Sequence, residues 1–267
     1  MAYAKFGFIG TGNMGSALVR AVRKSVDGEE ILLADSSAAK ASALAEELGC
    51  RAADNRTVAS EAKYIFLGVK PQMMSQLLSD IAPVLAARGD RFVLITMAAG
   101  LKISQYKEML GAKYPMIRIM PNTPVSIGEG VILYSFTDDV FMDEISDFSA
   151  ALSKAGVTDH IDEKLIDAAS AVSGCGPAFV YIFAEAMADA AVECGLPRAK
   201  AIEYAARTIS GAGKLITSTG RHPAELKDDV CSPGGTTIAG VHALENAGFR
   251  AAVMDAVKAA FEKNAKL

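Results

Sequence analysis

The first half of the chain alternates short apolar runs with longer segments of helical periodicity. The apolar runs, which predict β-strands, are residues 6–9, 31–34, 64–69, 92–96 and 116–119. Because each run is apolar on both faces, we expect its strand to be covered by helices on either side. The segments of helical character between them are residues 14–23, 38–48 and 73–87. This alternation predicts an α/β domain with a parallel sheet, to which residues 131–134 and 157–161 add further strands.

The pattern changes at about residue 162, where long Ala-rich stretches carry apolar residues at helical spacing. Proline opens a new helix at Gly176-Pro177, Gly195-Leu196-Pro197 and Gly220-Arg221-His222-Pro223. We therefore predict an α/β domain over residues 1–160 and an all-α domain over residues 161–267.

One segment of the all-α domain is crowded with large apolar side chains. They are Phe179, Tyr181, Ile182, Phe183 and Met187. Two interpretations are open: the segment packs against a second subunit, or it is a buried central helix of a single subunit. We favour the first, which makes the protein a homodimer or a higher homo-oligomer.

Composition and charge narrow the range of partners. The chain has 267 residues, of which 51% are hydrophobic and 22% charged, as in a globular protein with a sizeable core. Its net charge of −4 offers no basic surface for nucleic acid or for an anionic membrane. No membrane-spanning segment is expected, because the apolar stretch 178–192 carries Glu185 and Asp189.

The cysteines and histidines indicate neither a metal site nor a redox motif. Cys50, Cys175, Cys194 and Cys231 form no CxxC pair, and the three histidines stand far apart. Free thiols are typical of the reducing cytosol, so we expect a cytoplasmic protein, although an even number of cysteines leaves a disulfide open.

A glycine-rich turn joins the first expected strand to the first expected helix. Gly10-Thr11-Gly12-Asn13-Met14-Gly15 has the GxGxxG spacing of a dinucleotide-binding loop, and Asp35 follows at the end of the second strand. Gly10 permits the tight turn, Gly12 lets a pyrophosphate approach, and Gly15 lets the helix pack closely. The first domain is therefore expected to have a Rossmann-type fold that binds NAD or NADP.

The choice between NAD and NADP stays open. Asp35 favours NAD, because it can accept hydrogen bonds from the ribose hydroxyls and repels a 2′-phosphate. Ser36, Ser37 and Lys40 could instead hold that phosphate, or they could be an N-cap and a solvated helix face. Asn55 could contact the same phosphate or ribose, or it could be a turn residue.

Small residues follow further strands at the edge where open α/β sheets bind ligands. The loops are Val69-Lys70-Pro71, Met97-Ala98-Ala99-Gly100 and Met120-Pro121-Asn122-Thr123-Pro124. The first two leave room for a nicotinamide ribose, and two prolines stiffen the third, which is expected to face the nicotinamide. Lys70 is either a charge contact or an exposed residue held by its proline.

A second glycine-rich loop lies in the helical half. Ser232-Pro233-Gly234-Gly235 gives an open loop, and Thr236 and Thr237 follow where a new helix begins. Unpaired N–H groups at a helix start bind carboxylate or phosphate, and threonine hydroxyls can add a bond to the same ligand. A plain helix–turn–helix connection accounts for the glycines but not for the two hydroxyls, so we expect an anion site here.

Taken together, these motifs resemble the pyrroline-5-carboxylate reductase family over nearly the whole chain. The matching segments are residues 8–15, 69–71, 98–100, 118–124, 173–179 and 226–237. The last segment is the family's specific signature, whereas the first is shared with many dehydrogenases. The resemblance implies a Rossmann domain followed by a helical domain that intertwines with a partner's. It also implies an active site between one subunit's cofactor and the other's helical loop.

The resemblance also implies individual contacts. Those to substrate fall on Glu163, Asp229, Thr236 and Thr237, near Ser232 and Gly235. Those to the cofactor fall on Ile9, Gly10, Thr11, Gly12, Asn13, Met14, Ser36, Asn55, Gly68, Val69, Lys70, Pro71, Met97 and Ala99. The family uses NADPH or NADH, commonly preferring NADPH, and Asp35 departs from an NADP-friendly pattern.

The activity implied is the NAD(P)H-dependent reduction of 1-pyrroline-5-carboxylate to L-proline, the last step of proline biosynthesis. A ketone reductase needs an acid for the developing alkoxide, whereas an iminium already carries its proton and becomes a neutral amine. No dedicated acid is then required, and we expect the Thr237 hydroxyl to meet the ring nitrogen. Alternatives are a reductase of another cyclic imine, a β-hydroxyacid dehydrogenase with Lys200 or Lys214 as proton donor, and a non-catalytic dinucleotide sensor.

Overall fold

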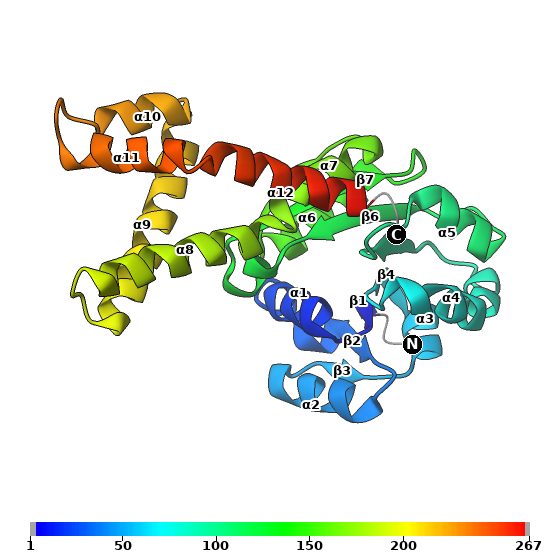
Figure 1. Ribbon diagram of the computed structural model, residues 1–267. Coiled ribbons are helices and arrows are strands. Elements are labelled where there is room, and N and C mark those ends of the chain that lie inside the picture. Colours follow the sequence, from blue (N-terminus) through cyan, green and yellow to red (C-terminus); the bar gives the residue numbers. More distant parts are fainter. Residues whose placement is uncertain (1–3, 265–267) are drawn as a thin grey trace. The chain divides into compact units, whose positions relative to one another are not determined.

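The computed structural model describes residues 4–264 and contains an eight-stranded sheet of order β3-β2-β1-β4-β5-β6-β7-β8 (Figure 1). The strands are β1 Ala4–Ile9, β2 Ile31–Ala34, β3 Arg51–Ala52, β4 Ala62–Leu67, β5 Val93–Thr96, β6 Met116–Pro121, β7 Gly130–Phe136 and β8 Gly156–His160. Neighbouring strands run parallel except β6 and β7, which are antiparallel. The parallel order on either side of β1 confirms the predicted Rossmann-type domain.

Helices connect these strands, and the buried side chains form two large clusters. The helices are α1 Asn13–Arg23, α2 Ala38–Leu48, α3 Asn55–Glu61, α4 Pro71–Ala86, α5 Ile103–Leu110, α6 Met142–Leu152 and α7 Glu163–Ser173. Because successive strand residues point to opposite faces, Phe8 and Leu33 enter one cluster and Ile9 and Leu32 the other. Strands buried on both sides explain why each run reads as wholly apolar.

Several elements lie outside the sequence-based expectation. The elements α3, α5 and α6 are not among the predicted segments, and α3 has only 7 residues, too few for a readable period. The strand β7 is antiparallel because only the short segment η2 Thr123–Ile127 joins it to β6. A parallel partner would need a crossover of about a dozen residues or more.

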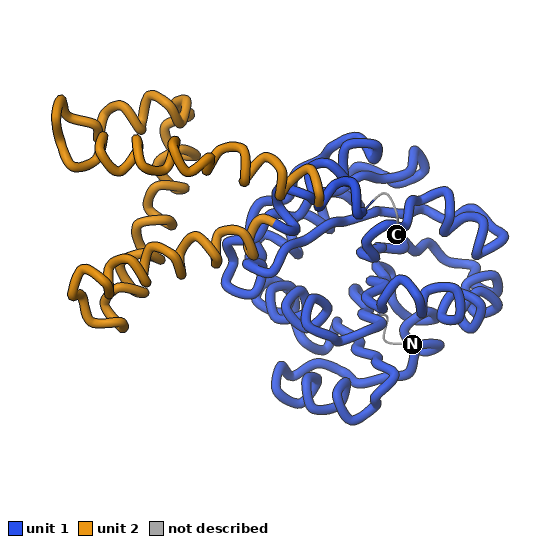
Figure 2. Tube along the Cα trace, in the orientation of Figure 1, with its two compact units in different colours: residues 1–175, 260–267 blue, residues 176–259 orange. Residues whose placement is uncertain are grey.

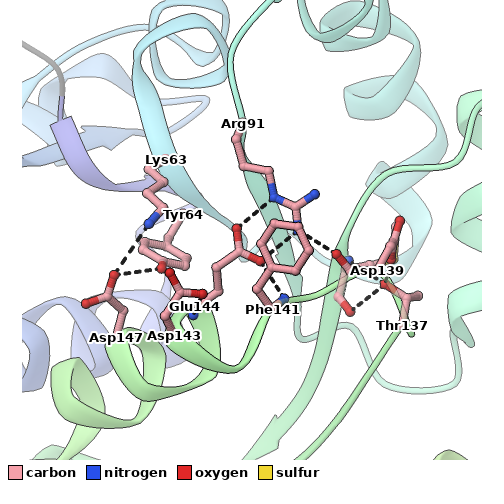
Figure 3. Close-up of polar contacts among 10 residues, drawn as sticks. Lys63, Tyr64, Arg91, Thr137, Asp139, Phe141, Asp143, Glu144 and Asp147 are labelled. Atoms are coloured by element: carbon pink, nitrogen blue, oxygen red, sulfur yellow. Dashed lines mark hydrogen bonds and ion pairs between the residues drawn. The ribbon is translucent and has the colours of Figure 1, made fainter.

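Polar contacts fasten α6 to the rest of the sheet domain (Figure 3). The carboxylate of Glu144 accepts hydrogen bonds from Arg91 Nε at 2.9 Å and Nη2 at 2.8 Å. One helical turn later, Asp147 accepts a bond from the Tyr64 hydroxyl at 2.8 Å and one from Lys5 Nζ at 2.9 Å. These contacts join segments far apart in the sequence, which explains why no local pattern predicts them.

The described chain divides into two compact units (Figure 2). Unit 1 contains the sheet and consists of the residues up to Cys175 together with those from Ala260 onward. Unit 2 consists of Gly176–Ala259. The helices from Gly176 onward are α8 Gly176–Glu193, α9 Arg198–Thr219, α10 Pro223–Asp229, α11 Thr236–Asn246 and α12 Phe249–Asn264. The helix α7 packs on the sheet through Ile166, which touches the cluster of Met120 and Leu133. The domain boundary after residue 160, drawn from composition, stays a prediction.

Unit 2 buries few of its apolar side chains. Its cluster of buried residues consists of Ala188, Ala201 and Ala205, while Tyr181 and Ile182 are 63% and 67% exposed. The helices α8, α11 and α12 line an apolar cavity of about 590 Å³. The unit therefore presents the large apolar face expected from its sequence.

Contrary to expectation, one segment passes a length-and-composition test for crossing a membrane. It is the helical run Glu163–Glu193, with 31 residues. The acidic residues of α8 are too few to fail that test, and a core helix of a soluble protein can pass it too. Only 11% of the most apolar window is buried within one copy, so most of its surface lacks cover from the same chain.

Candidate functional site

The glycine-rich turn follows β1 directly and opens α1. Gly10 has a φ of 102°, and a Cβ there would lie 2.7 Å from the Gly68 carbonyl. A Cβ on Gly15 would lie 2.1 Å from the Gly10 carbonyl oxygen, so only glycine allows α1 to pack this closely. A Cβ on Gly12 would meet no atom within 4 Å. A tight turn with open space in front of a helix start fits a pyrophosphate.

A groove runs from this turn along the carboxyl ends of the parallel strands. One cavity of about 470 Å³ is lined by Gly12, Asn13, Met14, Gly15, Gly68, Val69, Lys70, Pro71, Met97, Ala98 and Ala99. A second of about 610 Å³ is lined by Ile9, Gly10, Gly12, Asp35, Ser36, Asn55, Gly68, Val69, Lys70, Gln72, Met73, Gln76, Leu77 and Asp80. The two cavities share Gly12, Gly68, Val69 and Lys70, so they adjoin one another at the glycine-rich turn.

Asp35 stands at the end of β2 and holds the glycine-rich turn. Its Oδ2 accepts bonds from the Thr11 N–H at 2.8 Å and the Thr11 hydroxyl at 3.0 Å. Its Oδ1 accepts bonds from the Ser37 N–H at 3.0 Å and the Ser36 hydroxyl at 3.4 Å. Burial alone would raise the pKa of this carboxyl, but the hydrogen bonds from Ser37 and Thr11 outweigh it and lower the pKa. Asp35 is therefore an anion, and both of its carboxylate oxygens already accept hydrogen bonds from residues of this chain.

The residues after Asp35 are available to a ligand. Ser37 is the N-cap residue of α2, but its hydroxyl makes no capping bond, and Lys40 is exposed in the first turn of that helix. Asn55 is the first residue of α3, where Asp54 is the N-cap and accepts a bond from the Thr57 N–H at 2.7 Å. Asn55 therefore has no turn to cap, and it lines the second cavity.

The loops after β4 and β5 form the other part of the groove. Lys70 is the exposed N-cap residue of α4, and Pro71 occupies the first helical position, where a missing N–H costs nothing. Val69, Lys70 and Met97 line the first cavity, where we expect the nicotinamide ribose.

The second glycine-rich loop leads into α11 in unit 2. Gly234 has a φ of 67°, and the Gly235 N–H donates to the Ser232 carbonyl at 3.0 Å. A Cβ on Gly235 would lie 2.3 Å from the Ser232 hydroxyl oxygen, so this position excludes a side chain. No side chain caps the helix start at Gly235, which leaves the first N–H groups of α11 free for an anion.

Comparison with known proteins bears on both sites. A family model described as pyrroline-5-carboxylate reductase dimerisation matches residues 163–267, and one described as NADP oxidoreductase, coenzyme F420-dependent, matches residues 5–100. The pyrroline-5-carboxylate reductase of Escherichia coli is 40% identical over 266 residues, which cover 98% of each chain. The chain belongs to the pyrroline-5-carboxylate reductase family.

Other members of the pyrroline-5-carboxylate reductase family support this assignment. Pyrroline-5-carboxylate reductase 3 of Danio rerio is 40% identical over 98% of this chain and 91% of its own. A solved pyrroline carboxylate reductase of Plasmodium falciparum, with NADP bound, is 33% identical with a TM-score of 0.88 and covers 100% of this chain and 98% of its own. Family membership therefore extends over both units.

The groove brings together the cofactor contacts that the family resemblance implies. Each of them lines one of the two cavities except Thr11, which lies within the turn and holds Asp35. Among residues 4–264, no group of three or more His, Cys, Asp and Glu side chains could hold a metal ion. The individual cofactor contacts stay predictions.

The substrate contacts implied by the resemblance fall in different places. Ser232, Gly235, Thr236 and Thr237 lie together at the start of α11. Asp229 ends α10, and its carboxylate pairs with Arg221 Nη1 at 2.6 Å, which lowers its pKa. Glu163, by contrast, lies in unit 1 at the start of α7.

The sequence analysis assigned no role to Arg118, which the structure places at the centre of a buried ionic contact. Its side chain is 1% exposed and lies 3.2 Å from Glu163 and 2.9 Å from Asp167. The sequence does carry a signal for this contact, which is the single arginine in the otherwise apolar strand run of residues 116–119. A cation buried in a strand needs an anionic partner. The family motif of residues 118–124 contains this arginine.

Proposed function

We propose that this chain catalyses the NAD(P)H-dependent reduction of 1-pyrroline-5-carboxylate to L-proline. The observation that carries the proposal is that one chain of this family combines a complete dinucleotide groove with an uncapped helix start bearing two threonine hydroxyls. The groove fits a nicotinamide dinucleotide, because Gly12 leaves open space before α1 and several glycines and alanines line the adjoining cavity.

In this proposal the chain binds and orients its substrate rather than supplying a proton. When bound, a dihydronicotinamide supplies a hydride for a C=N carbon. The free N–H groups at the start of α11 bind the substrate carboxylate, and the Thr237 hydroxyl hydrogen-bonds the ring nitrogen. Because the protonated imine becomes a neutral amine, binding and orientation can account for most of the catalysis.

We also propose that the functional form is a homodimer in the cytoplasm. The apolar face of unit 2 and the family model described as dimerisation support pairing of two copies. The free state of Cys50, Cys175, Cys194 and Cys231 supports a reducing compartment. Because the glycine-rich loop of α11 and the groove lie in different units, a second copy can supply one of them to each active site.

The proposal is tested by the rate of NADPH and NADH oxidation with purified protein, followed at the nicotinamide absorbance band. We expect oxidation that depends on pyrroline-5-carboxylate. A faster rate with NADPH would show that Ser36, Ser37 and Lys40 set the cofactor preference, and a faster rate with NADH would show that Asp35 sets it. No oxidation with either cofactor would overturn the proposal. Turnover of six-membered cyclic imines or of 3-hydroxy acids would then identify a different enzyme of the same fold.

A further inference from the structure

A partly buried polar cluster lies next to the cofactor groove and has no part in the proposed chemistry. At its centre is Arg118 of β6, with a side chain 1% exposed. Its Nη1 is 3.2 Å from Glu163 Oε1, and its Nη2 is 2.9 Å from Asp167 Oδ1. Two carboxylates of α7 thus hold one buried cation, and such a contact is stable only while its geometry is kept.

The cluster adjoins the groove through the pairing of β5 and β6. Arg118 lies in register with Thr96, the last residue of β5, and the residues that follow, 97–99, line the groove. Ala99 also packs against the apolar contact of Met120 with Ile166, which is one turn along α7 from Glu163. Arg118 and α7 therefore lie directly behind this part of the groove.

Glu163 holds the far end of the same loop. Its Oε1 accepts a hydrogen bond from the Ile103 N–H at 2.8 Å. Ile103 is the first residue of α5, so this N–H has no acceptor inside its own helix. The loop of residues 97–102 is thus held by β5 at one end and by a charge-assisted hydrogen bond at the other.

The hydroxyl of Tyr106 lies on the buried side of this cluster, near Arg118. It is fully buried on α5 and makes no hydrogen bond of good geometry, although Thr96 and Arg118 lie near enough to influence it. Burial raises the pKa of Tyr106 to about 12. The Glu163 side chain is 28% exposed, so its bond to the Ile103 N–H is only partly shielded from water.

We infer that Glu163 is a positioning residue for the cofactor, which acts by holding the loop of residues 97–102 through the Ile103 N–H, rather than a contact to the substrate. Arg118 in turn fixes the Glu163 carboxylate. The inference rests on the proposed dinucleotide groove, but not on the identity of the imine that is reduced.

The test compares Glu163→Ala with Glu163→Gln in the full-length protein, by NADPH binding measured through nicotinamide fluorescence without substrate. We expect Glu163→Ala to weaken binding at least about fivefold, and Glu163→Gln to stay within about twofold of the original protein, because the amide oxygen still accepts the Ile103 bond. Amide hydrogen exchange of residues 97–103 should be faster in Glu163→Ala and unchanged in Glu163→Gln. Glu46→Ala, an exposed glutamate on α2, is the matched control and should change neither.

A second pair of variants breaks the same bond from the other side. Ile103→Pro removes the N–H at a first helical position that accepts proline, whereas Ile103→Ala keeps the N–H and loses a similar amount of apolar contact. We expect Ile103→Pro to weaken NADPH binding at least about threefold more than Ile103→Ala. This pair decides the matter if Glu163→Ala fails to fold.

Two results would overturn the inference. In one, NADPH binding is unchanged in Glu163→Ala while KM for pyrroline-5-carboxylate rises, as a direct substrate contact requires. In the other, Glu163→Ala and Glu163→Gln weaken NADPH binding equally, which makes charge and not the hydrogen bond the cause. Failure of the original protein to reduce the imine would overturn the proposed function alone, because this test needs only the cofactor.

Discussion

The two units differ most in how they bury their apolar side chains. In unit 1, Phe6, Tyr64 and Phe148 are each 0% exposed and belong to a cluster that runs across the sheet. In the described part of unit 2, the buried cluster is made of three alanines, and no residue of α10 or α11 is buried. One unit has a complete core within a single copy, and the other does not.

This difference indicates what holds each part of the proposed site in place, the dinucleotide groove in unit 1 and the start of α11 in unit 2. The dinucleotide groove lies at strand ends that a finished core holds in place. The start of α11 lies on a unit whose large apolar side chains are exposed, so its precise placement depends on a cover from elsewhere. A second copy is suited to be that cover, because an identical apolar face can pair with itself.

The largest effect is expected from placing a charge on that face. Ile182→Asp should weaken the dimer at least about a hundredfold, since an unpaired charge buried in an interface costs about 3 kcal/mol or more. The control is Met142→Asp, because Met142 of unit 1 is 72% exposed and Ile182 is 67% exposed. Sedimentation over a range of protein concentrations measures the effect. An Ile182→Asp protein that sediments as the original does would remove this face as the dimer contact.

The groove of unit 1 can be disturbed without disturbing its core. In Gly12→Ala the new Cβ meets no protein atom within 4 Å, so Tm should change by no more than about 2 °C. NADPH binding should nevertheless weaken about thirtyfold, because the methyl group occupies the space expected for the pyrophosphate.

Gly15→Ala is the contrasting variant for Gly12→Ala. It places a Cβ 2.1 Å from the Gly10 carbonyl oxygen and should lower both Tm and NADPH affinity. Thermal unfolding and fluorescence titration separate the two effects. Normal NADPH binding by Gly12→Ala would show that the pyrophosphate does not approach this glycine.

A smaller effect is expected at the start of α11. Thr237→Ala should lower kcat/KM for pyrroline-5-carboxylate about tenfold, the scale of one lost transition-state hydrogen bond of about 1.4 kcal/mol. NADPH affinity should not change, because Thr237 is not among the residues that line the groove. Thr237→Ser keeps the hydroxyl and should restore most of the activity. Unchanged kinetics in Thr237→Ala would exclude this role.

The smallest effect concerns the stability of unit 1 in acid. Burial would raise the pKa of Glu144, but the hydrogen bonds from Arg91 and the Phe141 N–H lower it below its ordinary value of 4.5. A carboxyl with a lowered pKa stabilises the folded state at neutral pH, and this contribution is lost as the pH falls through that ordinary value toward the folded one.

Glu144→Gln should therefore lower Tm at pH 7 by about 3 °C, with the difference shrinking at lower pH. Calorimetry over a series of pH values measures this. Asp229→Asn in unit 2 should change Tm less, because Asp229 and Arg221 are both exposed. A Tm difference for Glu144→Gln that is the same at every pH would contradict the assignment.

Much of the fold was predictable from local pattern. The runs around Phe8, Leu33 and Phe66 have the apolar character of strands covered on both faces, and the structure confirms them. The short α3 and the antiparallel β7 were not predictable in the same way. A helix of 7 residues shows no clear period, and strand direction follows from the length of a connection rather than from the strand itself.

In the candidate site, too, the features formed by neighbouring residues could be predicted, and those formed by distant residues could not. The glycine spacing of residues 10–15 and the loop of residues 232–237 are local motifs, because consecutive N–H groups and open φ angles are properties of neighbouring residues. The family resemblance placed Glu163 among the substrate contacts. That contact stays a prediction, and the structure shows the Glu163 carboxylate bonded to Ile103 and Arg118, which lie 60 and 45 positions away in the chain.

By itself the sequence determined the alternation of strands and helices, the dinucleotide loop, the second glycine-rich loop and the family. These depend on interactions between residues close in the chain. Only the tertiary structure decided that the oxygens of Asp35 hold the turn at Thr11, that Arg118 joins β6 to α7, and that unit 2 lacks a core of its own. Such contacts depend on the folded backbone bringing distant side chains within hydrogen-bonding distance, and no local pattern of residues encodes that distance.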